Sequence, residues 1–258
     1  IERSIIKKYR KELWNPFIAA VKRYQLIQAG DRIGVCISGG KDSMVLAKLM
    51  QQLQRVSDVP FEAVYLVMDP GYHPRNRAKI EENAVLLGLP IQIFETNIFA
   101  VTEQEPKSYC YLCARMRRGH LYSIAQGLGC NKIALGHHFD DAVETFFLSL
   151  FYEGRISCFQ PVTYLDRMGI TQIRPMLYCG EWMLRKAAER EHLPVVFNPC
   201  PADGYTKRQE VKELIHSLSK EYPDLREKVF SAMQRLPLPA WEPQDHRRRP
   251  LADDGREE

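Results

Sequence analysis

A glycine-rich hexapeptide, Ser38-Gly39-Gly40-Lys41-Asp42-Ser43, lies between the apolar run Ile33–Ile37 and a helical pattern of apolar residues from Met44 to Leu53. Backbone N–H groups at such a turn, together with the positive end of the helix dipole, bind anions, and Lys41 adds a full charge. Paired glycines let a phosphate approach the backbone more closely than a Cβ would allow. An ordinary turn between strand and helix is the alternative, but the four polar residues favour nucleotide binding.

The spacing of the hexapeptide differs from the Walker pattern, which places four residues between its first glycine and its Gly-Lys pair. It instead resembles the pyrophosphate-binding loop of the ATP pyrophosphatases, enzymes that split ATP between its α and β phosphates. The resemblance implies that residues 38–43 bind the phosphates of ATP. It also implies a Mg²⁺ ion, which one or two carboxylates hold together with phosphate oxygens.

A second motif, Gly136-His137-His138-Phe139-Asp140-Asp141, closes a predicted strand and opens a predicted helix. We favour Asp141 as the magnesium ligand or catalytic carboxylate, with Gly136 and His137 contacting the nucleotide. Asp140 has the same chemistry but a less certain role. The alternative is that both carboxylates only complement the helix dipole, a stabilisation of about 0.3–1 kcal/mol each.

Three cysteines stand in patterns that suggest metal binding. Cys110 and Cys113 form a CxxC pair at the start of a predicted helix, and Cys200 follows in a distant loop. Three thiolates fit either a four-iron cluster with one open iron or a Cys₃His zinc site completed by His120 or His138. The residues alone leave both possibilities open. Arg117, four residues beyond Cys113, shares its helix face and is placed to reach both the cysteines and the phosphates.

Short apolar strands alternate with helices along the chain, which predicts an α/β fold with a doubly wound, mostly parallel sheet covered by helices on both faces. The predicted strands are 33–37, 61–68, 90–95, 132–135 and 171–174. Loops that follow parallel strands meet at one edge of the sheet, where ligands bind. We therefore expect loops 38–43, 67–74 and 136–141 to converge, with the adenine beside the backbone of Val67 or Met68.

The composition is that of an ordinary globular protein: 258 residues, 45% hydrophobic and 26% charged, with a net charge of only +4. Nucleic acid would therefore be bound by a local basic rim and not by bulk charge. Candidates for that rim are Arg115, Arg118, Arg155, Arg174, Lys207 and Arg208. No apolar run approaches the roughly 20 residues of a membrane span, and the N-terminus lacks a signal-peptide pattern, so we expect no membrane association and a cytoplasmic location.

Four segments are expected along the chain. They are an N-terminal helical segment (1–30), an ATP pyrophosphatase α/β domain (31–178), a helical extension with the third cysteine (179–236) and a disordered tail (237–258). The tail has four prolines and three consecutive arginines, with almost no apolar residues.

Together the motifs resemble the tRNA 2-thiocytidine synthetases, iron–sulfur-dependent tRNA thiolases of the ATP pyrophosphatase type. The resemblance is carried by residues 38–43, 110–119, 134–141, 151–154, 173–175, Cys200 and Arg208-Gln209. It implies ATP, Mg²⁺, a 4Fe-4S cluster on Cys110, Cys113 and Cys200, a tRNA substrate, a homodimer, and a cysteine desulfurase or sulfide as sulfur donor. Lys41 and Asp141 join the three cysteines as the implied catalytic residues. The implied reaction adenylates a pyrimidine C2 carbonyl, that of a cytidine in the anticodon loop, and replaces its oxygen with sulfur.

The chain departs from the family pattern just before Cys200, where Asn198-Pro199 stands in place of a further cysteine. This difference bears on which base is modified. Three other functions remain in view: a nitrogen-joining ligase of the same ATP-cleaving type, an enzyme acting on another base or a small molecule with a zinc site, and a non-catalytic iron–sulfur protein that binds nucleotides. The three cysteines argue against the ligase, and the presence of Lys41 and Asp141 argues against a non-catalytic protein.

Overall fold

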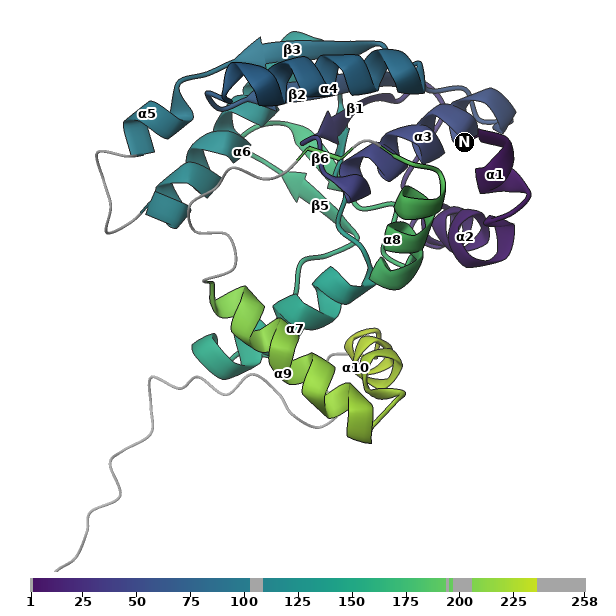
Figure 1. The fold of residues 1–258 in the computed structure, drawn as a ribbon, viewed down its shortest axis with the longest axis vertical. Coiled ribbons are helices and arrows are strands. Elements are labelled where there is room, and N and C mark those ends of the chain that lie inside the picture. The colour runs from purple at the N-terminus through teal and green to yellow at the C-terminus, as the bar shows by residue number, and fades with distance from the viewer. Residues whose placement is uncertain (1, 103–108, 194, 197–205, 236–258) are drawn as a thin grey trace, which may run out of the picture.

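A six-stranded sheet forms the centre of the protein in the computed structural model, which describes residues 2–102, 109–193, 195–196 and 206–235. The strands are β1 (Arg32–Ile37), β2 (Glu62–Asp69), β3 (Ile91–Glu95), β4 (Lys132–Ala134), β5 (Val162–Leu165) and β6 (Ile170–Ile173), in the order β3-β2-β1-β4-β6-β5. All neighbouring pairs are parallel except β5 and β6, which are antiparallel. The predicted mostly parallel sheet is confirmed (Figure 1).

Helices cover both faces of the sheet because its strands alternate between two apolar cores. Tyr65 and Val67 of β2 lie in the larger core. This core also holds apolar residues of α3 (Lys41–Val56), α4 (Pro74–Leu87) and α8 (Glu181–Arg190). Val64 and Leu66 point the other way, into a smaller core with α6 (Tyr109–Gly127). The doubly wound architecture expected from the sequence is therefore present.

The N-terminal helices pack on the same side as α3 and α8. They are α1 (Glu2–Ile6), the π-helical turn η1 (Arg10–Trp14) and α2 (Asn15–Arg23). Leu13 and Phe17 are completely buried in the larger core. The segment boundaries expected at residues 30, 178 and 236 stay a prediction, and the expected disordered tail, 237–258, lies outside the described residues.

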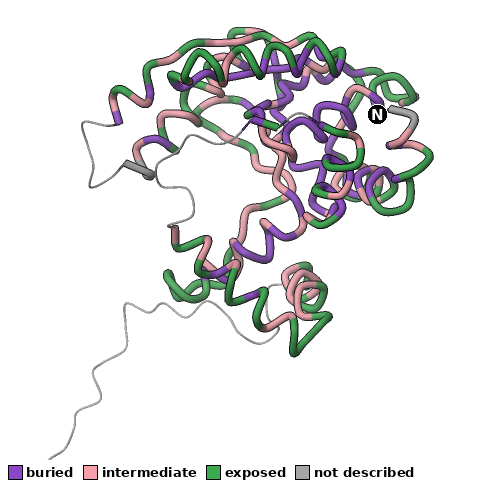
Figure 2. The backbone as a smooth tube through the Cα atoms, viewed as in Figure 1, coloured by how far each residue is buried: buried purple, intermediate pink, exposed green. Residues whose placement is uncertain are grey.

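The C-terminal helices α9 (Lys207–Glu221) and α10 (Leu225–Met233) pack on α7 (Phe139–Glu153) below the sheet (Figure 1). Val211 and Ile215 of α9 are buried against Val143 and Phe147 of α7. The rest of α9 and α10 is largely exposed or half-buried, whereas the buried residues gather around the sheet (Figure 2). No helix among the described residues is long and apolar enough to cross a membrane.

Two elements lie where the sequence predicted none. The short helix α5 (Ile98–Thr102) follows β3. Strand β5 pairs with β6 in a hairpin. It was not predicted because it has only four residues and these are partly exposed.

The backbone conformation of the turn between β1 and α3 requires a glycine at position 39 but not at position 40. Gly39 has a φ of +84°, and a Cβ there would lie 3.2 Å from side-chain atoms of Ile80 and Val196. Gly40 has a φ of −75°, and its Cβ would meet only the Ser38 hydroxyl at 3.5 Å. The left-handed backbone of Gly39 is therefore the position that sets the path of the turn.

We predict that Gly39→Ala destabilises the protein by about 1–2 kcal/mol or more, because a Cβ disfavours this left-handed backbone and the neighbours leave no room for it. Gly40→Ala is the matched control, with an expected cost below about 1 kcal/mol. Urea unfolding of both variants measures the difference. Equal stability of the two variants would show that the turn tolerates a side chain at either position.

Candidate functional site

The loops that follow β1, β2 and β4 converge at the carboxyl edge of the sheet. The order of strands reverses there, since the chain runs from β1 outward to β2 and β3 and then returns to β4 on the other side. A cavity of about 340 Å³ lies at this point. It is lined by eight residues that the sequence predicted to contact the nucleotide: Ser38, Asp42, Ser43, Met68, Arg117, Gly136, His137 and Asp141.

The β1–α3 turn is held by the Ser43 hydroxyl, which is almost completely buried. It donates a hydrogen bond to the Gly40 carbonyl (2.8 Å) and accepts one from the Ser38 N–H (3.1 Å). Within the part of the chain that the structure describes, no side chain caps α3, whose N-cap residue is Gly40. The N–H groups of its first turn therefore remain available to an anion, and the helix dipole adds positive potential.

Lys41 is not among the residues that line this cavity. Its Nζ lies 2.9 Å from Asp42 Oδ2 and 3.5 Å from Glu181 Oε1. Burial alone lowers the pKa of Lys41, but the neighbouring carboxylates of Asp42 and Glu181 outweigh it and raise that pKa. Lys41 is thus a firmly protonated cation at the start of α3.

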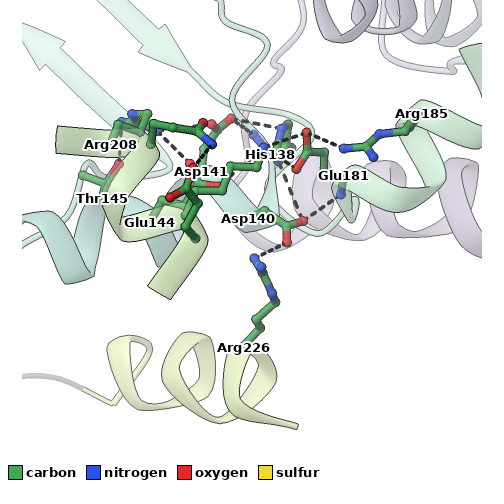
Figure 3. Close-up of polar contacts among 12 residues, drawn as sticks. His138, Asp140, Asp141, Glu144, Thr145, Glu181, Arg185, Arg208 and Arg226 are labelled. Carbon is green, nitrogen blue, oxygen red and sulfur yellow. Dashed lines mark hydrogen bonds and ion pairs between the residues drawn. The ribbon is translucent and has the colours of Figure 1, made fainter. Parts of the chain in front are cut away.

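The β4–α7 loop gives its two aspartates different surroundings (Figure 3). Asp140 is buried and uses both oxygens within the protein: Oδ2 accepts from the Glu181 N–H (2.7 Å), and Oδ1 lies 2.7 Å from Arg226 Nη1. It joins α7 to α8 and α10, which is a structural role. Asp141 Oδ2 accepts from the His138 N–H (3.0 Å), so the helix-capping alternative is also realised, but its carboxylate lines the cavity as well.

His137 reaches the same cavity with its ring packed on Phe159, the ring centroids being 4.9 Å apart. Burial lowers the pKa of His137 to about 4; the Asp141 charge opposes this shift, and the charges of Arg174 and Arg208 add to it. The imidazole is therefore neutral at pH 7. Its buried Nδ1 has no hydrogen-bond partner among the described residues, so it can bind a polar group of a ligand.

A second cavity, of about 260 Å³, adjoins the first, and Asp42 and Asp141 line both. Its other lining residues are Lys41, His138, Glu144, Glu181, Thr206, Arg208, Gln209 and Lys212. Glu144, Glu181 and Lys212 were not predicted from the sequence. The only local signal was the spacing of Asp140 and Glu144 on one helix and of Arg208 and Lys212 on another, four residues apart in each case.

The two unpredicted glutamates differ in their pKa. Burial raises the pKa of Glu144, whose side chain is 4% exposed. Burial also acts to raise the pKa of Glu181. The hydrogen bond and charge of Lys212, together with the charge of Lys41, outweigh burial and lower this pKa to about 2. Glu181 therefore stays ionised and ties α8 to α9, whereas the Glu144 carboxylate is held in its charged form less firmly.

Of the three predicted metal-binding cysteines, the structure describes the surroundings of Cys113. It is buried beside Met68 and Ile98, close to the end of β2. Cys110 lies in the first turn of α6, but its side chain and the whole of Cys200 lie outside the described residues. Among the described residues, no three His, Cys, Asp or Glu side chains are grouped to hold a metal ion.

Arg117 lies one turn beyond Cys113 on α6 and lines the first cavity. It is also hydrogen-bonded to Tyr72; burial raises the pKa of this tyrosine, and the arginine opposes that rise. The side chain is thus positioned between the end of β2 and the cavity. Its expected contact with both the metal-binding cysteines and the nucleotide stays a prediction.

Two cysteines outside the predicted metal site are held in their thiol form by burial, and the expected basic rim is exposed only in part. Burial raises the pKa of Cys36 to about 12 and that of Cys158 to about 11, so both remain thiols at neutral pH. Arg115 and Arg118 are exposed on α6. Arg174, expected in the same rim, is buried over the Phe159 ring and bonds Gln160 O and Gln172, so that part of the expectation was wrong.

Comparison with known proteins places the chain in a family. The PP-loop domain family matches residues 8–218. The tRNA-cytidine(32) 2-sulfurtransferase of Alkalilimnicola ehrlichii is 38% identical over 240 residues, covering 90% of this chain and 75% of the relative. That of Cellvibrio japonicus is 34% identical over 242 residues, covering 91% and 79%.

A solved structure shares the fold. The U34-tRNA thiolase NcsA from Methanococcus maripaludis, determined with its 4Fe-4S cluster, has a TM-score of 0.69 at 19% identity, covering 86% of this chain and 77% of that chain. Three observations indicate the same family. They are the motifs of the two loops, the convergence of these loops at one edge of the sheet, and the matches over most of the chain. The protein belongs to the PP-loop family and, within it, to the tRNA-cytidine(32) 2-sulfurtransferases, which confirms the family and the enzyme class that the sequence indicated.

Proposed function

We propose that this protein is an ATP-dependent tRNA sulfurtransferase that converts an anticodon-loop cytidine to 2-thiocytidine. The observation that supports this most directly is the cavity at the β1–β4 edge, where the PP-loop turn, the end of β2 and the His137–Asp141 loop come together. The relatives at 34–38% identity, which are tRNA-cytidine(32) 2-sulfurtransferases, supply the substrate of the proposal.

ATP lies with its adenine beside Leu66 and Met68 and its phosphates at the start of α3 in this proposal. The cytidine C2 carbonyl oxygen attacks the α-phosphate, a P–O bond to this oxygen forms, and the bond to the β-phosphate breaks to release pyrophosphate. The uncapped N–H groups of α3 and the Lys41 cation stabilise the charge on the leaving group. Sulfur then bonds to C2, and the C2–O bond breaks to release AMP.

A Mg²⁺ ion fits the oxygen atoms between the two cavities. Asp42 Oδ1 and Glu144 Oε1 are buried without a hydrogen-bond partner among the described residues, and Asp141 lines the same region. Hard cations of this kind are held by one or two carboxylates plus phosphate oxygens, so a preformed three-ligand cage is not required. Asp42 and Asp141 would hold the ion, which would neutralise phosphate charge.

A 4Fe-4S cluster on Cys110, Cys113 and Cys200 completes the proposal. Cys113 is buried against Met68, which lines the first cavity, and thiolate ligands suit iron. The NcsA thiolase, which shares the fold, has such a cluster. When bound with one open iron, the cluster would supply a site for sulfide next to the adenylated base. A cysteine desulfurase or free sulfide as donor, a homodimer and a cytoplasmic location belong to the same proposal.

We predict that the protein converts ATP to AMP and pyrophosphate, and that Lys41→Ala lowers turnover by about 100-fold or more, because a cation beside the departing pyrophosphate is lost. Stability should change by less than about 1 kcal/mol, since the side chain lies in a polar turn outside the core. Chromatography of the nucleotide products and urea unfolding measure both. Lys79→Ala, an exposed lysine of α4, is the control and should keep full activity. Formation of ADP and phosphate would contradict the proposed chemistry.

Cys110→Ala, Cys113→Ala and Cys200→Ala should each lose iron and abolish 2-thiocytidine formation, because each removes a cluster ligand. The controls Cys130→Ala, Cys158→Ala and Cys179→Ala should keep both, since these thiols are inert by their raised pKa values. Iron analysis of anaerobically purified protein and mass spectrometry of tRNA nucleosides provide the measurements. Stoichiometric zinc without iron, or full activity of Cys200→Ala, would rule out the cluster.

A further inference from the structure

Helix α9 is anchored so that its first turn faces the second cavity. Val211 and Ile215 are buried against α7. On the side of α8, Lys212 Nζ lies 2.8 and 3.0 Å from the two carboxylate oxygens of Glu181. These contacts fix the helix on two neighbours, and they place Arg208, one turn before Lys212, beside Asp141 and Glu144.

Arg208 lies farther from its carboxylate partners than Lys212 does from Glu181. Its Nη1 lies 3.3 Å from Asp141 Oδ1 and 3.4 Å from Glu144 Oε2, and its Nη2 lies 3.1 Å from Thr145 Oγ1 (Figure 3). Charge-assisted hydrogen bonds of this type are usually about 2.7–2.9 Å long. The side chain is also 43% exposed. The guanidinium therefore has long bonds to its partners and room to exchange them.

The second cavity lies where the outer phosphates of a bound ATP would extend. Asp42 and Asp141 line both cavities, and the start of α3 lies between them. With the adenine beside Met68 and the pyrophosphate end of ATP at the 38–43 turn, the β and γ phosphates lie at the start of α3, which the second cavity adjoins. Three cationic side chains, Lys41, Arg208 and Lys212, line it.

We propose that Arg208 binds the β and γ phosphates of ATP, its guanidinium moving from Asp141 and Glu144 to the phosphate oxygens. This inference rests on the proposed function and adds to it a substrate-binding residue from the C-terminal extension. The planar fork of an arginine matches two phosphate oxygens at once, which a lysine cannot do. In the nucleotide-free protein, the same guanidinium neutralises part of the carboxylate charge that would otherwise repel the incoming phosphates.

Calorimetric titration with two nucleotides separates this role from a structural one. The non-cleavable analogue α,β-methylene-ATP has the outer phosphates, and AMP lacks them. In Arg208→Ala we expect the analogue to bind about tenfold more weakly or worse, because charge-assisted hydrogen bonds are lost, while the affinity for AMP changes less than about twofold. Arg208→Gln retains a polar side chain near Thr145 and should show the same selective loss, so it decides the question if the alanine variant does not fold.

Arg235→Ala is the matched control, since this arginine of the same extension is exposed and its side chain bonds Ser231, one turn before it. It should bind both nucleotides as the wild type does. Unchanged binding of the analogue by the Arg208 variants, or an equal loss for the analogue and AMP, would overturn the inference and leave the proposed function intact. Failure of the wild-type protein to bind the analogue at all would overturn both.

Discussion

The reversal of strand order between β1 and β4 is the constraint on which the candidate site depends. Neighbouring parallel strands whose connections leave in opposite directions keep the space beyond their carboxyl ends open. The two loops that enter this space nevertheless lie close together: a Cβ added to Gly136 would be only 3.5 Å from the Ser43 backbone nitrogen. The start of α3 and the start of α7 are thereby fixed next to each other, and the proposed nucleotide contacts follow from that geometry.

Around this crevice, charged groups connect the sheet to the C-terminal helices. Asp140 links α7 with α8 and α10, and Glu181 links α8 with Lys41 and with Lys212 of α9. Buried or half-buried ion pairs are not strong evidence for stability, because desolvation offsets much of their attraction. Their consequence here is geometric: α9 packs mainly on α7, yet it places Arg208 and Lys212 beside the β1–α3 turn.

The sequence predicted the position of those site residues that directly follow a recognisable strand. Loops that follow parallel strands meet at one edge whatever the details of the side chains, and Ser38, Met68, Gly136 and Asp141 accordingly line one cavity. The direction of Lys41 could not be predicted, because it depends on Glu181, which is 140 residues away in the chain. Arg174 was misassigned for a similar reason. Its burial depends on Phe159 and on the hairpin of β5 with β6, neither of which has a clear sequence signal.

The central claim is that the base oxygen itself attacks the α-phosphate, and isotope transfer tests it most directly. A tRNA substrate carrying ¹⁸O at the C2 carbonyl of the target cytidine would be thiolated anaerobically with ATP, and the released AMP analysed by mass spectrometry. The account predicts one ¹⁸O atom in the phosphate of AMP for each 2-thiocytidine formed. Thiolated tRNA with unlabelled AMP, or with ¹⁸O only in water, would contradict it.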